Sequence, residues 1–450
     1  MVFKLSIRIF FILFLSFNLS AQNENILYLM DNVPSSKDVN ISSYEDSIKF
    51  NFSLPLISSF YTDINSDLAF NDIIQKRSDN SNFLAVNSLL TSLNQNNNFN
   101  IKSKINLFRI GFKIKNSYLD LIINENFKFN LDINEDIFQF LINGNKSYSN
   151  QSIGSLNFNF NHYREVALAF TKKISLNDKY LSIGVKPKYL IGLSNINLYN
   201  NFLYNSREDF SEIGLIVEGS GDISFPISIN SNEINFDQIT SNLKLDEYIL
   251  NNNNNGFGFD FGLGFKSKKI KISTSVINIG RINWIENSRN LSYEIGYNFN
   301  GFDISNSINK DDDNFIDFND LINNKIDSVE IKNSLTDNKK SFIENLKPRL
   351  FLNTSFIVSN KFEVGILFNS SFEKLIEHMN ITIHSSLKFN DVFHLIASYD
   401  NKSKLGVGLS IKGGPLQLYL LTNNVIDTYN IFYPYKANKI NLNMGINFVF

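Results

Sequence analysis

The chain has 450 residues and a formal net charge of −2, with 42 Lys and Arg against 44 Asp and Glu, and it contains no Cys. This balance argues against a basic nucleic-acid-binding protein, a disulfide-bonded scaffold and a Cys-ligated metal protein. Phe, Trp and Tyr make up 14% of the chain, with 43 Phe and 18 Tyr, which is a composition typical of strands joined by polar loops.

Residues 1–21 have the pattern of a secretory signal peptide. A short basic start with Lys4 and Arg8 precedes the apolar run Ile9–Phe17, and small residues close the segment at Ala21. We expect cleavage after Ala21. Because the apolar run is shorter than the about 20 residues of a membrane-spanning helix, any membrane residence of the mature chain is predicted to use strands.

The N-terminal part of the mature chain, up to about residue 100, contains apolar segments that do not alternate. Residues 22–100 are therefore predicted to hold the first strand together with an N-terminal plug inside a barrel. One part of this plug is the apolar stretch Ile26–Val33. The other part has helical spacing of its apolar residues, at Val86, Leu89, Leu90 and Leu93.

Apolar and polar residues alternate along most of the remaining chain, which is the pattern of half-buried strands. The clearest runs are Phe108–Ile114, Leu156–Phe160, Leu181–Val185, Phe257–Phe265, Tyr293–Phe299, Val364–Phe368, Leu405–Ile411, Leu416–Leu420 and Leu442–Phe450. We expect about fourteen spanning strands, with sixteen as the alternative, because bacterial single-chain barrels have even numbers. The runs Ile213–Val217 and Ile223–Ile229 are interpreted as an external hairpin.

The polar faces of these strands carry mainly Gly, Asn and Ser, as the crowded lumen of a barrel requires. If the apolar faces contact lipid, the strand charges fall on the inward face, namely Arg109, Lys113, Asp120, Lys128, Lys186, Asp260, Glu294, Glu363 and Lys412. A Lys or Arg facing lipid at mid-depth would cost about 2–4 kcal/mol. An open sheet edge in hydrocarbon would leave donors and acceptors unpaired. The sequence thus predicts an all-β protein: a single transmembrane antiparallel β-barrel over residues 22–450, monomeric, in the outer membrane of a Gram-negative bacterium.

Residues 305–345 are predicted to form a helical and acidic excursion between strands. Apolar residues have helical spacing at Ile322, Ile326 and Val329. Just before them, an acidic segment matches the oxygen-ligand register of an EF-hand loop at Asn309, Asp311, Asp313, Asp317 and Asp320. The loop departs from that pattern at Asn314, where glycine is usual, and at Asp320, where the longer Glu is usual. Two readings stay open: a calcium site that orders the loop, and a solvated turn before a helix, which we favour.

No other constellation indicates chemistry. The four histidines, His162, His378, His384 and His394, have no zinc-binding spacing and are interpreted as interfacial or loop residues. No Gly-x-Ser-x-Gly elbow is present, so we expect neither an enzyme nor a cofactor. The alternate glycines of Gly258–Gly264 lack the Lys-Ser/Thr of a phosphate loop, and they either let the wall bend or let a plug approach closely.

The C-terminal strand has a polar residue, a glycine and two aromatic residues at Asn443, Gly445, Phe448 and Phe450. This arrangement resembles the C-terminal β-signal of bacterial outer-membrane barrels, which the barrel-assembly machinery recognises. The resemblance implies that this machinery and the lipid bilayer are partners of the protein.

Several blocks of the sequence resemble a Bacteroidota outer-membrane β-barrel family catalogued as domain of unknown function 5723. The blocks are Ile26–Pro34, Leu54–Ser59, Gly256–Phe265, Asn278–Trp284, Gly301–Ile304, Leu346–Leu350, Gly406–Asn424 and Gly445–Phe450. The segment Ser35–Lys49 lacks the Asn-Pro stretch of the family. The resemblance implies a barrel over nearly the whole mature chain, but it assigns no substrate and no catalytic residue.

Two functions remain open at this stage. The first is a plugged channel or transporter for a small molecule, hydrophobic compounds included. The second is a barrel that transports nothing and serves as an anchor or partner for a surface or secretion assembly. An enzyme is the third and least favoured reading. The sequence does not decide between the first two.

Overall fold

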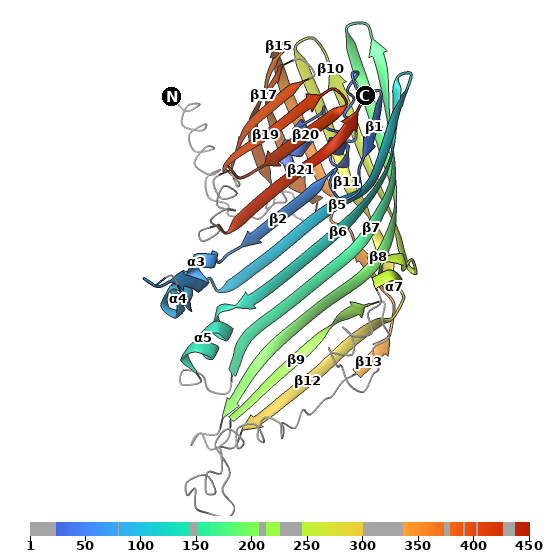
Figure 1. Cartoon of the computed structure of the whole chain (residues 1–450). Helices are drawn as coiled ribbons and strands as arrows, with labels where there is room; N and C mark the ends of the chain where they lie inside the picture. The colour runs from blue at the N-terminus through green and yellow to red at the C-terminus, as the bar shows by residue number, and fades with distance from the viewer. Residues whose placement is uncertain are drawn as a thin grey trace, which may run out of the picture.

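A computed structural model places most of the chain in one antiparallel β-barrel (Figure 1). The residues described are 24–79, 81–144, 151–206, 213–225, 245–299, 336–372, 379–389, 392–401, 404–425 and 437–450. Within them, no helix is long and apolar enough to cross a membrane.

The wall of the barrel has fourteen strand positions, as predicted. The first position is shared by two short strands, β1 and β2, which both pair with β21 on one side and with β5 on the other and so close the ring. The wall strands are β1 (Phe50–Ser53), β2 (Phe60–Ser66), β5 (Asn96–Ile114), β6 (Ser117–Asn134), β7 (Gln151–Leu176), β8 (Lys179–Ser206), β10 (Asn254–Lys266), β11 (Ile270–Trp284), β15 (Arg349–Ser359), β16 (Phe362–Ser371), β17 (Asn380–Phe389), β18 (Phe393–Asp400), β19 (Lys404–Gly413), β20 (Leu416–Thr422) and β21 (Lys439–Val449).

The two-residue period of the sequence sorts the side chains between the two faces of this wall. On β10, Phe257 is 70% exposed on the outer surface, whereas Asp260 is fully buried on the inner side. Arg109, Asp120 and Lys186 are buried inside as well. The predicted inward placement of these charges is confirmed.

The two ends of the barrel differ in the length of their connections. At one end, which we call the turn end, strands join through tight turns such as those between β5 and β6 and between β7 and β8. These two turns place Lys115 and Asn177 at positive φ. The C-terminus lies at the same end, where Phe450 O accepts hydrogen bonds from the amides of Lys49 and Phe50. The opposite end, with the long connections, is the loop end.

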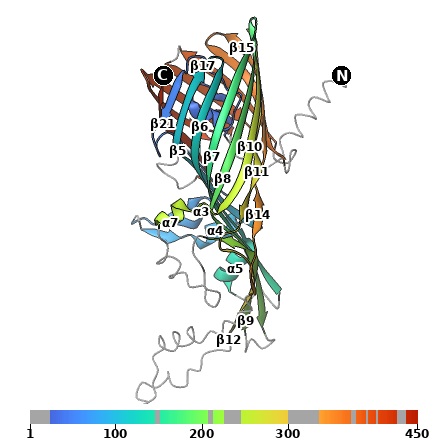
Figure 2. The ribbon, with the colours of Figure 1, turned by 90° about the vertical axis from the view of Figure 1, so that its right-hand side faces the viewer.

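Beyond the loop end, β7 and β8 continue into an extension (Figure 2). β8 has 28 residues, which at about 3.3 Å each span about 90 Å, three times the hydrocarbon thickness of a bilayer. Its first half pairs with β10, and its second half, from Asn195, pairs with β9. The other strands of the described chain outside the wall are β9 (Ile213–Ser224), β12 (Ser288–Phe299), β13 (Thr336–Lys339), β14 (Phe342–Asn345), β3 (Ile74–Lys76) and β4 (Asn82–Leu84).

Two expectations need correction here. The alternating run Tyr293–Phe299 belongs to β12, which pairs with β9 and β13, so this run and Glu294 lie in the extension and not in the wall. Alternation marks any strand with two unlike faces, and it does not name the partner strand. The run Ile213–Val217 is external as predicted, but it forms one continuous strand through Ser224, paired with β8.

Short helices occur at both the centre and the loop end of the barrel. In the lumen, the segment from Glu24 to Ile48 contains α2 (Asn25–Leu29) and the 3-10 helix η1 (Pro34–Asp38), both fully buried. Helices this short do not hold their shape alone, so packing in the lumen maintains them. The helices at the loop end are α3 (Phe70–Ile73), α4 (Val86–Ser92), α5 (Glu135–Asn143) and α7 (Leu245–Leu250).

The plug prediction is therefore confirmed for one segment and wrong for the other. Ile26–Val33 lies inside the barrel. Val86–Leu93 is helical over α4, as its spacing predicts, but α4 packs against α3 and α5 at the loop end, with only Leu89 buried in the helix. A seven-residue helix with one buried side chain has too little apolar surface to displace the polar lining of a lumen.

Candidate functional site

The segment Glu24–Ile48, which we call the plug, carries five acidic residues and one lysine. The inner wall facing it supplies lysines and arginines from β5, β8, β11, β15 and β17. The plug is thus an acidic body in a basic socket, and opposite charges inside a low-dielectric space attract strongly.

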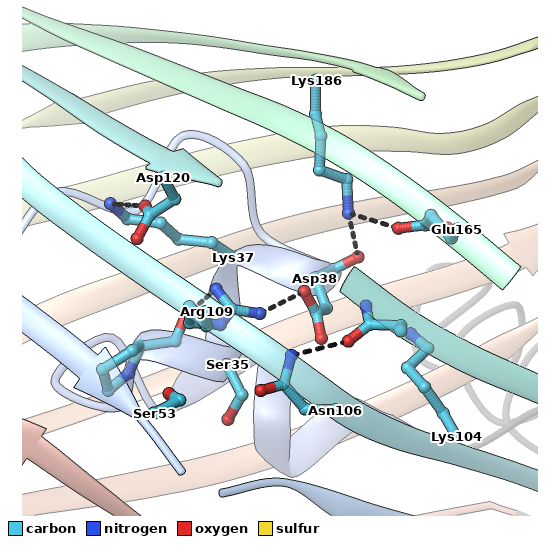
Figure 3. Close-up of polar contacts among 12 residues, drawn as sticks. Ser35, Lys37, Asp38, Ser53, Lys104, Asn106, Arg109, Asp120, Glu165 and Lys186 are labelled. Carbon is cyan, nitrogen blue, oxygen red and sulfur yellow. Dashed lines mark hydrogen bonds and ion pairs between the residues drawn. The ribbon is translucent and has the colours of Figure 1, made fainter. Parts of the chain in front are cut away.

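Arg109 on β5 makes the most deeply buried of these contacts (Figure 3). Its guanidinium donates to Asp38 Oδ1 of the plug at 2.5 Å and to the carbonyl of Pro34 at 2.9 Å. Burial would raise the pKa of Asp38, but Arg109, together with Lys104 and Lys186, holds this pKa well below its usual range. The carboxylate therefore stays charged and paired in the folded protein.

Lys37, next along the plug, reaches in the other direction. Its ammonium lies 2.8 Å from Asp120 Oδ2 on β6 (Figure 3). The same ammonium lies 3.3 Å from the centre of the Tyr118 ring. Asn51 on β1 donates to Asp120 Oδ1 at 2.9 Å and so supports the same carboxylate. Successive plug residues thus contact β5 and β6 with opposite charges, which fixes the plug in one position.

Two further acidic plug residues are held by wall cations at different depths. Glu24 lies 2.6 Å from an Arg349 nitrogen, near the loop end of β15. Asp31 accepts from Lys271 and Lys388, each at 2.7 Å. Burial would raise the pKa of Asp31, yet the two ammonium groups lower it well below its ordinary value.

Apolar packing completes the hold on the plug. Tyr28 stacks on Phe351 of β15 with ring centroids 4.9 Å apart, within a buried cluster that includes Ile26 and Met30. The plug approaches the wall closely where β10 has glycines. A Cβ at Gly262 would lie 2.8 Å from the Ser42 amide nitrogen, and one at Gly264 would lie 3.2 Å from Ser42 Oγ. The interpretation that these glycines admit a plug is confirmed.

The wall itself is interrupted between β1 and β2, at residues Leu54–Ser59, which we call the break. Six residues here occupy a stretch where the neighbouring strand β21 advances by only two, Gly445 and Ile446. The chain bulges outward, Leu56 adopts a φ of 68°, and Leu56 and Ile57 are 60% and 49% exposed on the outer surface. Such a bulge locally disrupts the ladder of strand hydrogen bonds.

A few hydrogen bonds still join the break to its neighbours. The Leu56 amide donates to the carbonyl of Asn106 at 3.0 Å, and the Ile446 amide donates to the carbonyl of Ile57 at 3.0 Å. The Asn106 amide donates to the carbonyl of Ser59 at 2.9 Å. A small number of contacts, instead of a continuous ladder, therefore joins the break to β5 on one side and to β21 on the other. We call these two joints the seam.

An apolar groove of about 560 Å³ lies on the outer wall over the break. Its lining is Leu56, Ile57, Phe60, Leu409, Ile411, Leu418, Tyr419, Leu420, Met444, Gly445 and Ile446. Tyr419 and Gly445 are the buried members of this set, and the Tyr419 ring lies in the same buried cluster as the plug residues. The groove outside and the plug inside thus share one residue.

Tyr419 connects the two by hydrogen bonds. Its hydroxyl accepts from Ser35 Oγ of the plug at 3.0 Å and donates to the carbonyl of Ser58 in the break at 3.2 Å. A Cβ at Gly445 would lie 2.0 Å from that same carbonyl, so only glycine lets the break fold back over β21. A chain of contacts runs from plug to Tyr419 to break.

The histidine prediction is wrong for the three described histidines, which are buried on the inner face. His162 lies between Glu125 at 3.1 Å and the Tyr248 hydroxyl at 2.6 Å. His384 contacts Asn353 at 2.8 Å, and His394 contacts Asn32 of the plug at 2.7 Å. Ring nitrogens can be buried in a polar lumen because the neighbouring strands supply partners. His378 lies outside the described residues.

The calcium candidates Asn309, Asp311, Asp313, Asp317 and Asp320 lie outside the described residues. The same holds for the helical spacing at Ile322, Ile326 and Val329 and for the predicted signal peptide. The described part of the chain contains no group of three or more His, Asp or Glu side chains that could hold a metal ion. In the predicted assembly signal, Asn443 faces inward and is buried, while Phe450 is exposed at the turn end.

Sequence reasoning missed the break and Tyr419. A signal was present in Pro55, because proline lacks the amide that a strand ladder needs and is found at edges and bulges. The contact between Tyr419 and Ser58 joins residues 361 positions apart, and no local pattern encodes it.

A closed fourteen-stranded barrel with an internal plug defines an outer-membrane-type β-barrel protein. The chain belongs to the family described as Family of unknown function (DUF5723), which it matches over residues 44–423.

Solved structures with a similar fold include three outer-membrane proteins. The toluene transporter TodX of Pseudomonas putida has a TM-score of 0.41 and 8% identity, covering 92% of this chain and 94% of that chain. The protease OmpT of Escherichia coli has a TM-score of 0.24 and 6% identity, covering 90% and 97%. A mutant porin of Rhodopseudomonas blastica has a TM-score of 0.22 and 8% identity, covering 90% and 100%. These likenesses concern the fold alone. No curated protein matches the sequence.

Proposed function

We propose that the protein is a plugged outer-membrane transporter for a small hydrophobic molecule, which passes between the bilayer and the lumen at the break. The observation that carries the proposal is the hydrogen-bonded chain from Ser35 through Tyr419 to Ser58, which links the plug to the seam of the wall. The proposed function is not enzymatic.

The location follows from the surface and the connections. The large exposed apolar side chains of the wall strands and of the break point outward, as contact with lipid requires. In bacterial barrels the short turns face the periplasm and the long loops face outward. We therefore assign the turn end to the periplasm of a Gram-negative bacterium and the loop end to the exterior. Assembly as a monomer through the segment Asn443–Phe450 is part of the same proposal.

The chemistry of the groove favours a hydrophobic cargo. Its lining side chains are almost entirely aliphatic or aromatic, whereas the lumen around the plug is lined by charged and amide groups. An apolar molecule gains free energy in the groove in proportion to the surface it buries, at about 25 cal/mol per Å². A polar solute gains nothing there, so the groove selects by polarity.

Movement of the plug is the step that would open the seam. While Ser35 and Tyr419 stay in contact, the Ser58 carbonyl has a partner and the break is held over Gly445. Withdrawal of the plug removes the Ser35 contact and frees the Tyr419 ring. A cargo molecule shifts this equilibrium only as far as it binds the open arrangement better than the closed one.

A disulfide lock tests this proposal, because the chain has no Cys of its own. Ser182 on β8 donates to the carbonyl of Ser42 in the plug at 2.8 Å, so Ser42→Cys with Ser182→Cys is designed to fix the plug to the wall. Cells that express the protein would be exposed to N-phenylnaphthylamine, a hydrophobic dye that lipopolysaccharide excludes. The rate at which membrane fluorescence rises is the readout.

We expect the oxidised pair to block dye uptake and a reducing agent to restore it, while each single cysteine variant behaves as the parent protein. Mass spectrometry would confirm that the disulfide forms. Equal uptake in the oxidised and the reduced state would rule out plug movement as the opening step. Uptake no faster than in cells without the protein would rule out transport of this dye class.

The second candidate, a barrel that anchors a surface or secretion assembly, is supported by one feature. β7, β8, β9 and β12 form an extension far longer than membrane spanning needs. Cross-linking in intact cells from a photoreactive residue at Tyr199 on the extension distinguishes this candidate. A single protein partner captured there, without any dye uptake, would favour the anchor over the transporter.

A further inference from the structure

The extension has a polar cleft of about 550 Å³ that is separate from the plug and from the groove. The cleft lies on the face of β7, β8, β9 and β12 that continues the inner face of the barrel. Its lining is Ser155, Asn157, Tyr199, Asn200, Asn201, Glu218, Gly219, Ser220, Ser292, Tyr293 and Glu294. A volume of this size falls within the range of binding sites for small molecules.

The strand register arranges this face as two parallel rows. One row runs across the four strands through Asn157, Tyr199, Ser220 and Ser292. The adjacent row runs through Ser155, Asn201, Glu218 and Glu294. Each row is made of directly opposed residues, so the side chains stand side by side on one surface.

Three of the lining residues, Asn200, Gly219 and Tyr293, alternate with the two rows, so they belong to the other face of the strands and support the cleft from behind. The Tyr293 ring lies over Gly219, where an added Cβ would meet the ring at 2.1 Å, and the Tyr293 hydroxyl donates to Asn200. The Asn200 amide in turn donates to the carbonyl of Leu156 at 3.0 Å. These contacts tie β7, β8, β9 and β12 together, so the cleft is formed before any ligand arrives.

The cleft itself presents groups that are not used within the described chain. Tyr199 is 53% exposed and stands in the middle of the first row. Glu218 and Glu294 are directly opposed and both exposed, and like charges in this position destabilise a strand pair. No hydrogen bond or ion pair of either carboxylate occurs among the described residues. A ligand that supplies hydrogen-bond donors would relieve the repulsion between these two opposed carboxylates.

We propose that this cleft binds a saccharide. The exposed Tyr199 ring offers a flat apolar surface for the C–H face of a sugar ring. The Asn157 amide offers donors and an acceptor, the Asn201 amide nitrogen offers donors while its oxygen accepts from Ser152 at 3.0 Å, and the two carboxylates can accept from sugar hydroxyls. A basic peptide would satisfy Glu218 and Glu294 but would leave the amide-rich half of the cleft without matched partners, so the saccharide fits the whole lining better.

This inference does not depend on the transport proposal, since none of the cleft residues touches the plug or the break. The same sugar chemistry has two sources: the carbohydrate of lipopolysaccharide in the same membrane, and free oligosaccharides in the medium. The test therefore needs one arm for each source.

Calorimetry on the full-length protein in detergent would measure binding of maltohexaose, of chitohexaose and of the core oligosaccharide released from lipopolysaccharide. The variants are Tyr199→Ala and Tyr199→Phe, together with the double variant Glu218→Gln, Glu294→Gln. Tyr399→Ala is the matched control, because Tyr399 is a similarly exposed tyrosine, at 61%, on the outer wall. Heat-modifiable migration in gels would confirm that every variant retains a folded barrel.

For at least one of the three saccharides, we expect Tyr199→Ala to weaken binding about tenfold or more, as for the loss of one stacking contact, and Tyr199→Phe to stay close to the parent. The double variant is expected to weaken binding as well, while Tyr399→Ala has no effect. Preference for the core oligosaccharide would identify lipopolysaccharide as the source, and preference for the other two would identify free glycans.

Absence of heat with all three saccharides at millimolar concentration would overturn the proposal. Equal binding by the parent and by Tyr199→Ala would overturn the assignment to this cleft. Binding of oligo-lysine that depends on Glu218 and Glu294, without saccharide binding, would assign the cleft to a basic peptide instead.

Discussion

The Tyr419 hydroxyl donates to the carbonyl of Ser58 at 3.2 Å, and through this contact a side chain of β20 holds the one interrupted position of the described wall. The same hydroxyl accepts from Ser35 in the plug. One oxygen atom is therefore hydrogen-bonded both to the plug in the lumen and to the break in the wall. Any coupling between plug and seam has to act through such a contact, because two sites are coupled only by interactions that differ between their states.

Replacement of Tyr419 by Phe removes that oxygen and leaves the ring. The buried Ser58 carbonyl and the Ser35 hydroxyl then lack a partner, which costs about 1–3 kcal/mol for each group that stays unpaired. We expect faster dye uptake and a lower unfolding midpoint in urea. Tyr399→Phe is the control, because Tyr399 lies on the outer face of β18 without such a bond in the described chain. An unchanged uptake rate in Tyr419→Phe would show that the Tyr419 hydroxyl does not couple the plug to the seam.

Gly445 tests the break from the other side. A Cβ at this position would lie 2.0 Å from the Ser58 carbonyl, so Gly445→Ala must push the break away from β21. We expect a weaker seam, seen as a lower temperature for the loss of the folded band in heat-modifiability gels. Gly413→Ala is the matched control, since nothing lies within 4 Å of a Cβ there and the residue sits in the same barrel. If both variants lose the folded band at the same temperature, the break can accommodate a methyl group at residue 445 without weakening the seam.

Arg109 and Asp38 form a buried pair whose partners should be tested separately and together. Arg109→Met leaves the Asp38 carboxylate buried without its partner, which we expect to cost about 3–5 kcal/mol. The double variant Arg109→Met, Asp38→Asn removes the uncompensated charge and should recover most of that loss. The readout is trypsin cleavage after Lys37, which is buried beside the pair in the parent protein. Equal cleavage in the single and the double variant would contradict this account.

The architecture could be predicted from the sequence because it depends on local periodicity. Alternating residues such as Phe257 and Gly258 define two unlike faces, and the charges Arg109 and Asp260 have to point inward if lipid covers the outer face. The approximate strand number follows from counting such runs, although one of them, Tyr293–Phe299, lies outside the wall. The plug at Ile26–Val33 could also be predicted, because an apolar stretch without alternation does not fit a wall strand.

The pairing of the strands with one another could not be predicted in the same way. The runs in β9 and β12 alternate like wall strands, but they pair with each other past the loop end because β8 is too long to remain in the bilayer. The break and the Tyr419 contact depend on residues that are far apart in the chain. The polar networks around His162 and His394 are likewise built from separate strands, so single-residue spacing gives no signal for them.

Acid should loosen the plug, and Asp31 is the residue best placed to show it. Asp31 is in the plug and not in the wall, and its pKa lies well below the ordinary value of 3.8 despite burial, because Lys271 and Lys388 stabilise its charge. A group whose pKa is lowered on folding stabilises the folded state above its unfolded pKa. That contribution is lost as the pH falls through the folded pKa. Stability from Asp31 is therefore complete above about pH 4 and declines below it.

Glu45 acts in the opposite direction, because burial and the nearby Asp31 raise its pKa. The comparison is therefore best made in the Glu45→Gln background. There, Asp31→Asn should lower the urea midpoint at pH 7 and flatten its decline between pH 4 and pH 2.5. Asp178→Asn is the control, since that side chain is 71% exposed at the turn end and contacts only Lys268 within the described chain. A decline in Asp31→Asn as steep as in the background would assign the acid sensitivity to other carboxylates.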